Sequence, residues 1–113
     1  MPFTERQIDG ITILDLTGQL TEGSGNEMWS RVRDLAAAGD TRVVLNLADV
    51  SYVDSSGLGT MVASFVAMKR IGGRLKLLNP TKRTQQLLAV TALRTVMQSF
   101  DNEALAVASF SKM

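Results

Sequence analysis

The residues best suited to chemistry lie in one short segment, Asp54-Ser55-Ser56-Gly57, which follows a predicted strand and opens a predicted helix. Two adjacent hydroxyl groups beside a carboxylate could be modified or could contact a partner, because functional loops of parallel sheets lie beyond the carboxyl ends of the strands. The segment also has a plain structural explanation. Ser55 and Ser56 are both candidate caps for the helix, and residue spacing alone favours that role.

The composition excludes several classes of catalyst. The chain has 113 residues and contains neither cysteine nor histidine. Disulfides, thiolate nucleophiles, cysteine-ligated metal centres and a Ser–His–Asp triad are therefore impossible. No activating base lies near the two serines in sequence, and Asp54 is the single carboxylate in their loop. We expect no catalytic residues, no metal ligands and no cofactor, and the chain is predicted not to be an enzyme.

Charge and hydropathy narrow the set of partners and the location. Twelve basic and eleven acidic residues leave a formal net charge of +1, which gives no general attraction to nucleic acid or to an anionic membrane. The longest uncharged stretch, residues 55–68, is shorter than the roughly 20 residues that a membrane span needs. The first residues lack the pattern of a secretory signal. We predict a cytoplasmic protein that binds neither nucleic acid nor a membrane.

The hydrophobic pattern predicts one α/β domain over residues 1–113. Residues 4–8 and 11–17 are expected to pair as a hairpin around Asp9-Gly10, a dipeptide that favours a tight turn. Strands then alternate with helices in the order β-β-α-β-α-β-α-β-α, which implies mostly parallel pairing. The later elements are expected as a helix ending at Gly39, a strand at 43–47, a helix from about Ser56 to Gly72, a strand at 75–78, a helix from Pro80, a strand at 96–100 and a helix capped by Asp101.

The second predicted helix is unusual because residues 55–68 carry no charge. Its expected inner side is large and apolar and comprises Leu58, Met61, Val62, Phe65 and Val66. Its expected outer side is small and weakly polar and comprises Gly59, Thr60, Ala63, Ser64 and Ala67. Small residues beside exposed hydroxyls favour the close approach of another protein. Burial of the helix on both sides, in a three-layer fold or a dimer, would produce the same pattern.

Two further patterns carry no predicted site. Gly57 and Gly59 begin like a dinucleotide-binding loop, but Val62 stands where the third glycine belongs. A loose basic run lacks interleaved aromatic residues, so we expect it to be a solvated face rather than a nucleic-acid site. This run comprises Arg70, Arg74, Lys76, Lys82 and Arg83. Elsewhere in the chain, Ser24 or Asn26 is expected to cap the first predicted helix.

The segment Asp54-Ser55-Ser56-Gly57-Leu58-Gly59, with residues 44–47 and 50–53 before it, resembles a STAS domain. More narrowly, the chain is similar to the stand-alone anti-sigma factor antagonists of bacteria, and the resemblance covers nearly all of it. The resemblance implies a mixed, mostly parallel sheet with an antiparallel N-terminal hairpin and about four helices packed on it.

The resemblance also implies a regulatory cycle. The family carries a phosphate on the first of the two serines, here Ser55; Ser56 is the second choice because we expect it to cap the helix. The unphosphorylated antagonist would bind an anti-sigma factor, a serine kinase of the histidine-kinase-like ATPase type, and release its target. Phosphorylation would prevent binding until a serine phosphatase acts. The residues expected to contact the partner are Thr21, Asp54, Ser56, Gly57, Leu58, Gly59, Thr60 and Ala63.

The chain departs from the family pattern at two places. Many members carry an acidic residue where this chain has Thr21, with Glu22 following, so the identity of the partner stays open; many also have glycine where this chain has Ala92. Two other functions compete with the antagonist. One is an accessory STAS subunit of a lipid-transport ABC complex, which would dock through the same helix without phosphorylation. The other is a STAS module that binds a small ligand, or an enzyme, through residues 55–60.

Overall fold

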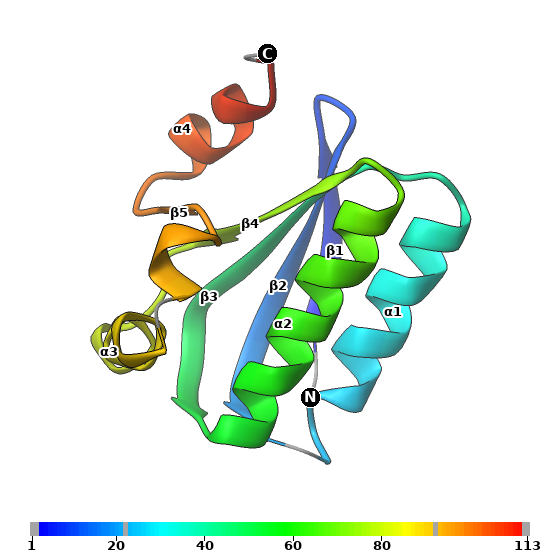
Figure 1. Cartoon of the computed structure of the whole chain (residues 1–113). Helices are drawn as coiled ribbons and strands as arrows, with labels where there is room; N and C mark the ends of the chain where they lie inside the picture. The colour runs from blue at the N-terminus through cyan, green and yellow to red at the C-terminus, as the bar shows by residue number, and fades with distance from the viewer. Residues whose placement is uncertain (1–2, 22, 92, 112–113) are drawn as a thin grey trace.

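Five strands form a single mixed sheet in the order β1-β2-β3-β4-β5, shown in the computed structural model in Figure 1. Strands β1 and β2 pair antiparallel and the other neighbours pair parallel, so the predicted fold class is confirmed. The structure describes residues 3–21, 23–91 and 93–111. Its elements are β1 (Phe3–Ile8), β2 (Ile11–Leu20), α1 (Asn26–Ala37), β3 (Arg42–Val53), α2 (Ser55–Arg70), β4 (Arg74–Leu78), α3 (Lys82–Val90), the 3-10 helix η1 (Leu93–Thr95), β5 (Ser99–Phe100), α4 (Glu103–Ala108) and the 3-10 helix η2 (Ser109–Ser111).

The predicted hairpin turn is confirmed. Asp9 and Gly10 both have positive φ, at 53° and 77°, which is the conformation that a two-residue turn between twisted strands requires. The turn sets the register of β1 against β2, with Ile8 opposite Ile11.

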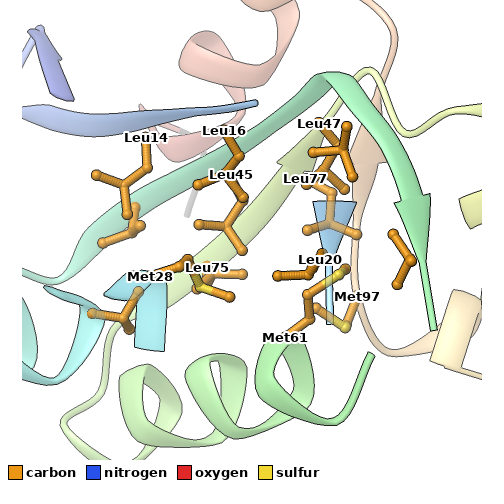
Figure 2. Close-up of a cluster of buried hydrophobic side chains, with 14 of the residues drawn as sticks. Leu14, Leu16, Leu20, Met28, Leu45, Leu47, Met61, Leu75, Leu77 and Met97 are labelled. Carbon is orange, nitrogen blue, oxygen red and sulfur yellow. The ribbon is translucent and has the colours of Figure 1, made fainter. Parts of the chain in front are cut away.

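Each side of the sheet has its own apolar core. Because side chains alternate along a strand, Leu45 and Leu47 face helices α1, α2 and α3 while Val44 faces α4. Figure 2 shows the larger core, in which Met28 of α1 and Met61 of α2 lie against the strand leucines. The sheet is therefore the middle layer between three helices and one short helix. No helix among the described residues has the length and apolar character to cross a bilayer.

Two cationic side chains of β4 hold the C-terminal segment against the sheet. Lys76 Nζ donates to Ser109 Oγ at 2.8 Å and lies 4.5 Å from the centre of the Phe110 ring. Arg74 donates to the carbonyl of Phe110 at 2.7 Å. Lys76 is only 4% exposed, and this burial lowers the pKa of its ammonium group. The expected solvated face is therefore wrong for Lys76, although Arg70, Lys82 and Arg83 are exposed.

A second set of ionic contacts ties α4 to the N-terminal hairpin. Arg6 binds Asp15 of β2 and donates to Glu103 at 2.6 Å, and Asn46 donates to Asp15 at 2.7 Å. The hydrogen bond from Arg6, helped by that from Asn46, holds the pKa of Asp15 below its ordinary value. A depressed carboxylate pKa stabilises the fold above the ordinary value near 3.8, and this contribution is lost as the pH falls through the folded pKa.

The structure corrects several predicted boundaries. Helix α1 has Gly25 at its N-cap without a side-chain cap, because the Ser24 hydroxyl instead donates to the carbonyl of Gln19. Thr81, one residue after Pro80, caps α3. The cap of α4 is Asn102 rather than Asp101, because the Asn102 side chain accepts the backbone N–H of Leu105. Strand β3 runs to Val53, and β5 is limited to Ser99–Phe100. Glu22 and Ala92 lie outside the described residues.

The position of Phe110 predicts a stability effect. Phe110 is 4% exposed in the smaller core, so Phe110→Ala should lower the free energy of unfolding by about 3 kcal/mol through lost burial and a cavity. Leu105→Ala, at a side chain of α4 that is 59% exposed, should change it by less than about 0.5 kcal/mol. Urea denaturation measures both. Equal losses for the two variants would contradict the role assigned to the C-terminal segment.

Candidate functional site

The site lies where β2 and β3 end side by side. Leu20 pairs with Val53 at the carboxyl ends of these parallel strands. The next residue, Asp54, donates its backbone N–H to the carbonyl of Leu20 at 3.2 Å. This bond fixes the chain at the edge of the sheet before it enters α2. Figure 1 shows the start of α2 beside the ends of both strands.

Asp54 is the N-cap of α2. Its backbone is extended, and its carboxylate accepts the backbone N–H of Gly57 at 2.7 Å. The prediction that Ser55 or Ser56 caps the helix is therefore wrong. The helix begins one residue earlier than that prediction requires, so the two serines occupy its first two positions. Both are exposed, and neither hydroxyl has a hydrogen-bond partner within the described part of the chain.

Gly57 allows this geometry because the first turn of α2 touches the last carbonyl of β2. A Cβ atom at Gly57 would lie 2.0 Å from the oxygen of Leu20, far inside any tolerable contact. Position 57 therefore requires glycine, because any larger residue would clash with the backbone of Leu20. Gly59, two residues later, is exposed and would meet nothing within 4 Å. The two glycines of this segment therefore have different roles.

The loop between β2 and α1 packs beside the same turn. A Cβ atom at Gly25 would lie 2.7 Å from Oγ1 of Thr60, so this glycine lets the loop approach α2 closely. The Ser24 hydroxyl accepts the backbone N–H of Thr21 at 2.8 Å and thereby shapes the loop. The structure therefore places the loop that carries Thr21 next to the N-terminal part of α2.

Helix α2 presents a more apolar outer side than expected. Its buried residues are Gly57, Leu58, Met61, Ser64 and Met68. Val66 is 40% exposed and Val62 is half-buried, so the predicted inner side is wrong for Val66. The contact between α2 and α1 explains this difference. Ser64 of α2 is fully buried at that contact, and its hydroxyl lies 3.3 Å from the sulfur of Met28 in α1.

Because α2 turns its buried residues toward α1 and the sheet, its remaining residues form a continuous outward surface, which we call the α2 surface. It is free of charge until Lys69 and consists of Ser55, Ser56, Gly59, Val62, Ala63 and Val66.

The residues predicted to contact the partner separate into two groups. Six lie at the surface, either half-buried or exposed: Thr21, Asp54, Ser56, Gly59, Thr60 and Ala63. The other two, Gly57 and Leu58, are buried beneath it. Tyr52 has no site role predicted from the sequence, yet it is the penultimate residue of β3, two positions before Asp54, with 42% of its surface exposed. Neighbouring side chains of a strand point to opposite faces, so the apolar Val53 next to Tyr52 is the signal that could have identified Tyr52 as an exposed residue. Among the described residues, no group of three acidic side chains could hold a metal ion.

A sequence profile of the STAS domain matches residues 3–106. The anti-sigma-B factor antagonist of Bacillus subtilis is 35% identical over 85 residues, which cover 74% of this chain and 76% of that protein. The chain belongs to the anti-sigma factor antagonist family of STAS domains. This family consists of regulators rather than enzymes, which agrees with the prediction made from the sequence.

Solved structures of similar fold cover almost the whole STAS domain. A putative anti-sigma factor antagonist from Thermotoga maritima matches with a TM-score of 0.88 at 24% identity, over 95% of this chain and 92% of that chain. The unphosphorylated anti-sigma factor antagonist SpoIIAA matches with a TM-score of 0.79 at 19% identity, over 99% and 100% of the two chains. The phosphorylated Bacillus SpoIIAA matches with a TM-score of 0.78 at 21% identity, over 96% and 99%. At these identities the likeness shows a shared fold.

The two glycines of the site offer a matched test of its geometry. Gly57→Ala should lower the free energy of unfolding by about 3 kcal/mol or more, because the carbonyl of Leu20 must move away from the new methyl group. Gly59→Ala should raise it by up to about 1 kcal/mol, because alanine is the better helix former and the space is open. Urea denaturation distinguishes them. Similar values for both variants would show that the first turn of α2 is not held against β2.

Proposed function

We propose that this STAS domain acts as an anti-sigma factor antagonist that is switched off by phosphorylation of Ser55. Unmodified, it binds an anti-sigma factor that is also a serine kinase, and the bound sigma factor is released. Phosphorylated, it no longer binds. The observation that carries this proposal is the exposed hydroxyl of Ser55 at the first position of α2, left without a capping role because Asp54 caps the helix.

The position of Ser55 suits a modification that leaves the fold intact. Backbone N–H groups and the dipole at a helix N-terminus favour an anion. SpoIIAA supports this argument, because the present fold matches its unphosphorylated and phosphorylated forms with nearly equal TM-scores of 0.79 and 0.78. We therefore propose that the phosphate acts on the interface with the partner rather than on the structure of the domain.

The electrostatics of the α2 surface explain how one phosphate can block binding. A phosphoserine carries about −1.5 to −2 charges, and it would stand beside the Asp54 carboxylate. The rest of the α2 surface is uncharged and includes the exposed Val66. A partner that covers these apolar groups would have to remove water from the phosphate without supplying an opposite charge, which costs several kcal/mol.

The proposed partners follow from the family. The Bacillus subtilis relative is an anti-sigma-B factor antagonist. By this likeness we propose an anti-sigma factor kinase of the histidine-kinase-like ATPase type as the binding partner and a serine phosphatase as its opponent. Asp54, Ser56, Gly59, Thr60, Ala63 and the Thr21 loop would form the contact surface. Gly57 and Leu58 would position that surface, because they are buried beneath it.

Phosphorylation is tested with candidate anti-sigma factor kinases from the same organism. Incubation with the kinase that binds the domain, together with ATP, should add one phosphoryl group that peptide fragmentation places on Ser55. Ser55→Ala should abolish the modification, and the matched control Ser56→Ala should retain it. Modification of Ser56 instead would contradict the assignment. The absence of phosphate transfer from every candidate kinase would contradict the phosphorylation switch and would favour the unphosphorylated accessory subunit.

Binding is tested by isothermal titration with the same kinase. Ser55→Asp should weaken binding by about tenfold or more, because a carboxylate on the α2 surface must be desolvated in the complex. Gln86→Asp adds a charge at an exposed position of α3, outside the α2 surface, and as the control for charge alone it should have a smaller effect. Circular dichroism should show that both variants remain folded. Wild-type affinity of Ser55→Asp would overturn the proposed mechanism.

A further inference from the structure

One edge of the sheet is only partly covered. Strand β3 pairs with all of β4, from Arg74 to Leu78. On the other side of β4, strand β5 pairs only with Leu77 and Leu78. Residues 74–76 therefore form a short open stretch of edge strand. Such an edge is a surface on which a segment of another chain can add a strand.

The backbone of Leu75 faces this open edge. The N–H of Leu77 donates to the carbonyl of Gln98, on the side of β5, whereas the N–H of Arg74 donates to the carbonyl of Thr41, on the side of β3. Because these directions alternate along a strand, the N–H and carbonyl of Leu75 point to the same side as those of Leu77. Within the described part of the chain, no residue pairs with Leu75 on that side.

A cavity of about 190 Å³ adjoins this edge between α2 and the segment that leads into β5. Phe65 and Val96 provide its apolar surface, and Val96 is 51% exposed. Lys69 lines the same cavity, with its ammonium 5.7 Å from the centre of the Phe65 ring. No acidic side chain is among the described residues that line it. The cavity therefore suits an apolar group with a carboxylate nearby.

Positive charge flanks the edge on both faces of the sheet. Lys69 lies on the face of α2, while Arg74 and Lys76 lie on the opposite face, 5.1 and 4.5 Å from the centre of the Phe110 ring. Arg74 and Lys76 are two residues apart, so they share one face of the strand. A second copy of the chain would bring the same cations against this edge, which disfavours self-pairing.

We propose that this edge, formed by residues 74–76 with Phe65, Lys69 and Val96, binds a short extended acidic segment of another protein as an added strand. The backbone of Leu75 supplies one donor and one acceptor. An apolar side chain of the segment enters the cavity, and the acidic side chains before and after it lie on the opposite face of the sheet, beside the exposed Arg74. The site is independent of Ser55, since Lys69 lies fourteen residues further along α2, about 21 Å away.

The test is an NMR titration of the ¹⁵N-labelled chain with an acetylated and amidated Gly-Glu-Val-Glu-Gly peptide. The amide signals of Leu75, Val96 and Gln98 should shift, and Gly-Lys-Val-Lys-Gly should shift none of them. Arg74→Glu should weaken binding of the acidic peptide by about fivefold or more, because it replaces an attraction by a repulsion on the face that carries the glutamates, and circular dichroism should show that the variant remains folded. Arg33→Glu makes the same change of net charge on α1 and should alter binding by less than about twofold.

Three outcomes would overturn the proposal. The first is the absence of shifts at Leu75 and Val96 at millimolar peptide. The second is equal weakening by Arg74→Glu and Arg33→Glu, which would indicate attraction to net charge alone. The third is a set of shifts that depends on the concentration of the chain rather than the peptide, which would identify a second copy as the occupant. None of these outcomes bears on Ser55, which is tested by phosphate transfer.

Discussion

Leu20 ends β2 with its carbonyl oxygen against the first turn of α2, and the arrangement of the site follows from that contact. The oxygen accepts the backbone N–H of Asp54 and leaves no room for a Cβ atom at Gly57. The Asp54 carboxylate in turn holds the N–H of Gly57. These three residues determine where the helix begins. Because the cap is supplied by Asp54, the next two residues are free to present hydroxyl groups to solvent.

The orientation of α2 is a second consequence of close packing. Gly25 lets the β2–α1 loop approach Thr60, and Ser64 is buried against Met28 of α1. These contacts rotate the helix so that Val66 lies at the surface. With 40% of its surface exposed, Val66 forgoes roughly 1 kcal/mol of burial free energy that a partner can recover. The apolar character that suits the helix to binding therefore results from how it packs on α1.

The sequence was sufficient to predict the order of the strands and helices. It also predicted the hairpin, since Asp9-Gly10 has few other conformations available between two strands. The family resemblance also identified the fold correctly. The cap could not be chosen from the sequence, because aspartate and serine are comparable caps and three of them are consecutive at residues 54–56. The buried side of α2 was ambiguous because apolar residues occur all around that helix. Lys76 was misassigned because its burial depends on Ser109, 33 residues away in the chain.

The electrostatic character of α2 changes along its length, and this change bears on how its two ends can act together. The N-terminal end is uncharged apart from Asp54, whereas Lys69 and Arg70 lie in its last turn, where cations favour the helix dipole. The ends are separated by about 21 Å, more than twice the Debye length of about 8 Å at physiological ionic strength. Charge added at Ser55 is therefore screened from the edge of β4. Coupling between the two surfaces would have to pass through movement of α2, which the contact between Gly57 and Leu20 opposes.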